Sequence, residues 1–136
     1  MTALEFFMPM KPPTITDQEH RLGVNKAGKP FVYQDAELAA AKAKLHDHLA
    51  PYAPKKPFDG ALRLYTKWCF PVIQGKHDGQ PRNTKPDTDN LQKALKDQME
   101  SLHFFVNDSR VAEEFIGKYW AEIPGIWIRL EEIEND

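Results

Sequence analysis

The clearest structural signal in the chain is GALRLYTKWCFPV at residues 60–72, where apolar and polar side chains alternate. Such alternation is typical of a strand with one buried face, because successive side chains of a strand point to opposite sides. One side of this strand carries Leu62, Leu64, Thr66 and Trp68. The other side is mixed and carries Arg63, Tyr65, Lys67 and Cys69. We therefore predict a central strand with a core face and a more polar face.

Two helices are predicted, one on each side of this strand in the sequence. Residues 35–52 and 89–103 both have apolar side chains at helical spacing. Asp35 is the expected N-cap of the first helix, and Pro51 and Pro54 end it. Asp89 is the expected N-cap of the second helix, with a glutamine three residues later.

Further strands are predicted before and after these helices. The expected strands are residues 4–10, 28–35, 110–122 and 126–133. The last two flank Ile123-Pro124-Gly125, which predicts a hairpin. This order of elements predicts a single α+β domain over residues 1–136, with a small mixed or antiparallel sheet and two main helices packed on it.

The charge is unevenly distributed along the chain. The net charge is −2, but residues 55–96 carry 9 basic and 4 acidic side chains, whereas residues 97–136 carry 3 basic and 10 acidic ones. A polyanion would prefer the middle block. The same charges are also compatible with an ordinary solvated surface.

Several protein classes are excluded by composition. No stretch approaches the roughly 18 apolar residues of a membrane span, and the N-terminus does not resemble a signal peptide. Cys69 is the single cysteine, so no internal disulfide can form. We expect a cytoplasmic protein.

Residues 73–86 are rich in glycine, proline and charge and predict a mobile loop. At this length a loop is often functional. Its basic side chains are candidates for contacts with phosphate: Lys76, Arg82 and Lys85.

The loop ends in KPDTDN, residues 85–90, which places two carboxylates one residue apart. Capping a helix explains Asp89 but leaves Asp87 unexplained. If the backbone stays extended, both side chains point the same way and repel each other unless a cation or proton neutralises them. Oxygen ligands of this kind suit Mg²⁺ or Mn²⁺.

Two further residues extend this candidate site. Lys93 follows Asp89 by one helical turn, which fits either a surface salt bridge or a cation that acts on phosphate. Asp108, in VNDSRV, fits either an ordinary Asx turn or a third carboxylate ligand, if the next strand returns alongside the helix start. Three carboxylates and a lysine beside a basic loop are a plausible site for metal-assisted phosphodiester cleavage.

These motifs resemble the RusA family of Holliday junction resolvases, many of which are carried by prophages. The resemblance rests on K-P-D-x-D-N-L-x-K, here Lys85 to Lys93, followed at a distance by an acidic turn, here Asp108 and Val111. It also includes Lys118 in IGKYW and covers roughly the last 75 residues.

The resemblance implies a homodimeric, Mg²⁺-dependent endonuclease that resolves four-way DNA junctions by paired nicks in recombination and repair. It implies that Asp87, Asp89 and Asp108 hold the metal and that Lys93 acts on the phosphate. Large apolar residues near the C-terminus are expected to contribute to the dimer contact: Phe115, Tyr119, Trp120 and Trp127. The residues alone also leave open a non-catalytic DNA-binding module and a small metal-dependent phosphatase.

Overall fold

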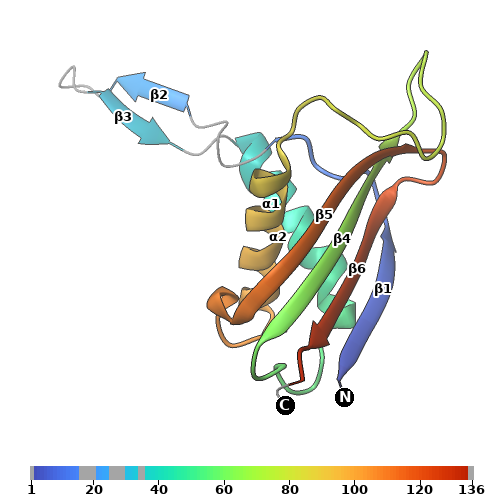
Figure 1. Ribbon diagram of the computed structural model, residues 1–136. Helices are drawn as coiled ribbons and strands as arrows, with labels where there is room; N and C mark the ends of the chain where they lie inside the picture. The colour runs from blue at the N-terminus through green and yellow to red at the C-terminus, as the bar shows by residue number, and fades with distance from the viewer. Residues whose placement is uncertain (1, 16–20, 25–29, 34–35, 135–136) are drawn as a thin grey trace.

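The computed structural model describes residues 2–15, 21–24, 30–33 and 36–134. They form a four-stranded sheet with two helices on one face and a separate two-stranded sheet, which confirms the α+β class (Figure 1). In chain order the elements are β1 (Ala3–Pro9), β2 (Arg21–Val24), β3 (Pro30–Tyr33), α1 (Ala36–Leu49), η1 (Ala50–Tyr52), β4 (Leu62–Pro71), α2 (Thr88–Ser101), η2 (Asp108–Arg110), β5 (Val111–Ala121) and β6 (Gly125–Glu132).

The main sheet is mixed and has the strand order β1-β6-β4-β5. β4 pairs in parallel with β5 and antiparallel with β6, and β6 pairs antiparallel with β1. β4 is therefore an interior strand, as its alternating sequence predicts. β2 and β3 pair with each other in the smaller sheet.

The predicted hairpin of residues 110–122 and 126–133 is wrong. Both strands exist, as β5 and β6, but β4 lies between them. The cause is the connection that precedes β5: α2 crosses over the sheet after β4, and a helical crossover returns the chain parallel to the strand it left. The turn after β5 then carries the chain past the end of β4 to its other side (Figure 1).

The core lies between the sheet and the two helices. The four residues predicted on the core face of β4 are all fully buried, which confirms that face. The helices contribute buried side chains at the predicted spacing, among them Leu45, Leu49, Leu91, Leu95 and Met99. Both helices cover the same face of the sheet, and no helix of the described residues covers the opposite face (Figure 1).

Element boundaries differ from the predicted ones by a few residues. The first helix ends at Leu49 and continues as the 3₁₀ turn η1, which contains Pro51. The expected cap at Asp35 lies outside the described residues, as do the ends of the strand predicted at 28–35, and β2 was not predicted. Among the described residues, no helix has the length and apolar character needed to cross a membrane.

Candidate active site

The start of α2 presents two exposed aspartates, Asp87 and Asp89. The N-cap is Asp87, with extended backbone (φ −75°, ψ 145°), whereas Asp89 lies in the first helical turn. The cap was therefore predicted two residues too late. Pro86, directly before the N-cap, is buried. The Asp87 side chain makes no capping hydrogen bond among the described residues, so helix formation does not occupy its carboxylate.

The first turns of α2 are anchored to β4 through a buried polar chain. Thr66 Oγ1 donates to Gln92 Oε1 at 2.7 Å, and Trp68 Nε1 donates to Thr66 Oγ1 at 3.1 Å. Within the described part of the chain, Gln92 Nε2 is buried without a partner. With Gln92 held inward, the neighbouring turn places Asp89 and Lys93 on the outer side of the helix, where both are exposed.

Lys93 makes a surface ion pair, but with Asp97 and not with Asp89. Its Nζ lies 3.6 Å from Asp97 Oδ2, and 63% of the side chain is exposed. A pair of this kind stabilises a helix by only a few tenths of a kcal/mol. The ammonium is therefore exposed and only weakly held, and in this structure it lies toward Asp97, one turn further from the two aspartates.

Asp108 lies at the opposite end of α2. Its backbone N donates to Glu100 Oε1 at 2.7 Å, beside the last turn of the helix. From Asp89 to Glu100 the helix rises about 17 Å. Asp108 does not reach the helix start, because β5 runs parallel to β4 and begins where α2 ends; only the far end of β5 comes to the start of α2. The predicted Asx turn is formed by Asn107, whose Oδ1 accepts from the N–H of Ser109, so it does not occupy the Asp108 carboxylate.

Within one chain, the three carboxylates are therefore not brought together. No group of three or more histidine, cysteine, aspartate or glutamate side chains in the described ranges could hold a metal ion. A single subunit presents two carboxylates at one end of α2 and the third at the other end. One subunit alone therefore does not form a three-carboxylate site for Mg²⁺.

The three basic residues predicted to contact DNA fall into two kinds. Lys76 and Lys85 are exposed. Arg82 is half-buried, with its guanidinium over the rings of Phe70 and Trp120 at 4.4 and 4.5 Å. Burial lowers the pKa of Arg82.

Lys118 joins this region from β5 and was not among the predicted site residues. Its Nζ donates to the backbone oxygens of Thr84 and Pro86 at 2.6 and 2.7 Å, directly before Asp87. Burial lowers the pKa of Lys118 and the nearby Arg82 lowers it further, while the charge of Asp87 acts in the opposite direction. Only the parallel pairing of β4 and β5 reveals this contact, because 32 residues separate Lys118 from Pro86.

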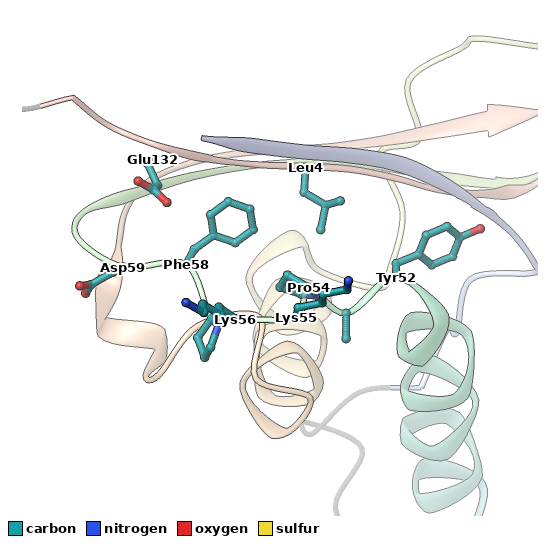
Figure 2. A pocket seen from close by; sticks show the side chains of 10 residues that line it. Leu4, Tyr52, Pro54, Lys55, Lys56, Phe58, Asp59 and Glu132 are labelled. Carbon is teal, nitrogen blue, oxygen red and sulfur yellow. The ribbon is translucent and has the colours of Figure 1, made fainter. Parts of the chain in front are cut away.

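A pocket of about 770 Å³ opens at the Asp108 end of the molecule. Leu4 points into it from the sheet, and Lys55 and Lys56 lie along the loop on its other side (Figure 2). Asp59, which also lines it, accepts a hydrogen bond from Arg110 Nη1 at 2.7 Å in the turn that follows Asp108. None of the predicted carboxylates lines this pocket.

Comparison with known families identifies the chain. The model of the family described as Endodeoxyribonuclease RusA matches residues 9–131. The chain belongs to the RusA family. No curated protein matches it.

RusA membership makes the chain a member of an endodeoxyribonuclease family and confirms the resemblance seen in KPDTDN and VNDSRV. The match covers most of the chain and contains all the predicted site residues. The prophage origin stays a prediction, as do the individual roles of the carboxylates and Lys93.

Proposed function

We propose that this RusA family member is a Mg²⁺-dependent endonuclease, also able to use Mn²⁺, that resolves four-way DNA junctions by paired nicks. The observation that carries the proposal is the RusA match over residues 9–131. The active form is a homodimer, and the reaction belongs to DNA recombination and repair. A cytoplasmic location is part of the same proposal.

Each residue at the start of α2 has a separate role in the proposed reaction. Asp87 and Asp89 provide exposed carboxylate oxygens at a helix N-terminus, where negative charge is also stabilised by the helix dipole. These carboxylates would hold a Mg²⁺ ion, which would supply Lewis-acid activation of the scissile phosphate and of the attacking water. Lys93, on the same exposed side of the helix, contacts the phosphate as negative charge develops on it.

The third carboxylate comes from a partner subunit. Asp108 is too far from Asp87 and Asp89 in its own chain, since most of the length of α2 separates them. A two-fold axis that sets the α2 helices of two subunits antiparallel would bring Asp108 of the partner subunit to the start of α2. Such a dimer has two identical three-carboxylate sites, which suits a roughly two-fold junction that must be cut twice.

The surface of β5 supports association with a second copy. β5 is an edge strand of the sheet and runs from the Asp108 end toward the start of α2, where residues 79–82 pair with its last residues. Phe115, near its middle, is 45% exposed. An exposed edge strand is a ready site for pairing with another chain. Trp120, expected in the dimer contact, is buried within the subunit instead.

The test is cleavage of a labelled synthetic four-way junction with and without Mg²⁺. We expect paired nicks only with Mg²⁺, and none by an Asp87→Asn variant that still binds the junction. Binding should persist or tighten in that variant because a negative charge near the phosphates is lost.

Two control substrates separate the proposal from the alternatives. A linear duplex of the same sequence should remain intact, and so should a generic phosphomonoester. Junction binding without cleavage in any divalent metal would make the protein a DNA-binding module. Hydrolysis of the phosphomonoester alone would make it a phosphatase.

A further inference from the structure

The segment before Asp87 is docked on the end of β5. Pro81 lies opposite Tyr119 in an antiparallel bridge. The backbone hydrogen bonds on either side of it are Gly79 N to Trp120 O at 2.8 Å, Trp120 N to Gln80 O at 2.8 Å, and Arg82 N to Lys118 O at 2.9 Å. Residues 79–82 of the predicted mobile loop therefore pair with the end of β5.

The Arg82 side chain packs on the core and forms hydrogen bonds within this segment. The guanidinium lies against the rings of Phe70 and Trp120, which are only 1% and 5% exposed. Its Nε donates to Thr84 Oγ1 at 3.0 Å, and its Nη2 donates to the carbonyl oxygen of Lys85. A planar guanidinium can stack and donate in two directions at once, which a lysine ammonium cannot do.

Lys118 holds the next part of the same segment. Its ammonium bridges the carbonyl oxygens of Thr84 and Pro86. Together with Arg82, it accounts for hydrogen bonds to the carbonyls of three consecutive residues, Thr84 to Pro86. The next residue is Asp87, the N-cap of α2.

We infer that Arg82 and Lys118 are positioning residues, which fix residues 84–86 and thereby the direction of the Asp87 and Asp89 carboxylates. This inference rests on the proposed function and revises the prediction that Arg82 contacts DNA. The two cations act on the protein backbone, whereas the exposed Lys76 and Lys85 are left for the DNA phosphates. A displacement of about 1 Å in a catalytic group can lower a rate on the order of 10²-fold, so the loss of either cation should be seen in cleavage.

The deciding variants are Arg82→Lys and Lys76→Ala, measured for single-turnover cleavage and for junction affinity at several salt concentrations. Arg82→Lys keeps the positive charge but loses the planar guanidinium that stacks on the rings and donates hydrogen bonds in two directions. We expect cleavage to fall on the order of 10²-fold, with affinity and salt dependence unchanged. Lys76→Ala removes a proposed phosphate contact, so it should lower junction affinity and reduce the slope of log affinity against log salt by about 1. Cleavage at the wild-type rate by Arg82→Lys would overturn the inference. So would a smaller salt dependence of junction affinity in Arg82→Met, because it would mean that the charge of Arg82 contacts the DNA phosphates.

Hydrogen exchange tests the same inference without activity. In Lys118→Met, the amides of Arg82 and Leu91 should exchange faster, while amides in the β4–β6 pair keep their protection. Unchanged exchange at Arg82 and Leu91 would overturn the positioning role. If the wild-type protein cuts no junction, the proposed function fails, and this measurement still decides whether Lys118 holds the segment. If Lys118→Met does not fold, the more conservative Arg82→Lys takes its place.

Discussion

The two roles considered for Lys93, a surface ion pair and a catalytic cation, differ strongly in the size of their energetic effect. As half of an exposed pair with Asp97, it contributes a few tenths of a kcal/mol to stability. If it stabilises the transition state electrostatically, its loss should raise the activation barrier by about 2.7–4 kcal/mol, as is typical for one such group. A rate measurement distinguishes values so far apart.

Lys93→Ala should therefore lower single-turnover cleavage on the order of 10²-fold. Junction affinity should change far less, because only one of many phosphate contacts is lost. Asp97→Asn is the matched control, since it breaks the same ion pair but keeps the lysine, and it should cleave at the wild-type rate. Equal losses of cleavage rate in Lys93→Ala and Asp97→Asn would show that Lys93 acts only through the ion pair, by stabilising the helix.

At the scale of elements, the face of the sheet that the helices do not cover carries a network of arginine–glutamate ion pairs. Arg63 on β4 donates to Glu113 on β5 and to Glu131 on β6. Arg129 on β6 donates to Glu131 and to Glu5 on β1. The network thus connects all four strands in their observed order. Since these pairs are partly solvated, their contribution to stability is modest and depends on pH.

This network predicts a loss of stability in acid. The hydrogen bond from Arg63 lowers the pKa of Glu131 below its usual 4.5, and the bonds from Trp127 and Arg129 lower that of Glu5. Between the folded and unfolded pKa values, the unfolded state binds more protons, so the stabilisation is present above about pH 4.5 and is lost as the pH falls. Urea midpoints should decrease below that pH.

Glu131→Gln isolates this effect. The variant should be less stable near neutral pH and should show a shallower decrease of the urea midpoint in acid. Glu122→Gln, at an exposed position after β5 outside the network, is the matched control and should follow the wild type. Parallel pH curves for wild type and Glu131→Gln would exclude a role of the network in acid stability.

At the scale of the whole molecule, the distance between Asp108 and Asp87 requires a second subunit if the proposed site has three carboxylates. Asp108 follows the end of α2, and Asp87 precedes its start. A solution species of twice 15.7 kDa by light scattering is the first expectation. It does not by itself show that the site is shared.

Mixed dimers test whether the site is shared. Asp87→Asn and Asp108→Asn should each be inactive as homodimers. When the two are unfolded and refolded together, a heterodimer has one site with both defects and one intact site. We expect nicking to return, with one cut per junction rather than two. If each site lay within a single chain, the mixture would stay inactive.

Local chemistry made much of this protein predictable from its sequence. The alternation in residues 60–72 identifies a strand and its core face, because side chains of a strand alternate whatever the partner strands are. The spacing of Leu91, Leu95 and Met99 identifies a helix and its buried side for a similar reason. The carboxylates of KPDTDN and their place beside a helix start are likewise visible in the sequence.

The tertiary structure alone decided the relations between distant segments. The order β1-β6-β4-β5 depends on the α2 crossover, so the turn signal at Ile123-Pro124-Gly125 could not reveal that β4 separates the strands on either side of it. The same parallel pairing brings Lys118 to the backbone before Asp87 and leaves Asp108 at the far end of α2. Periodicity reports which side of an element is buried, but the neighbours of that element depend on how the elements pack together.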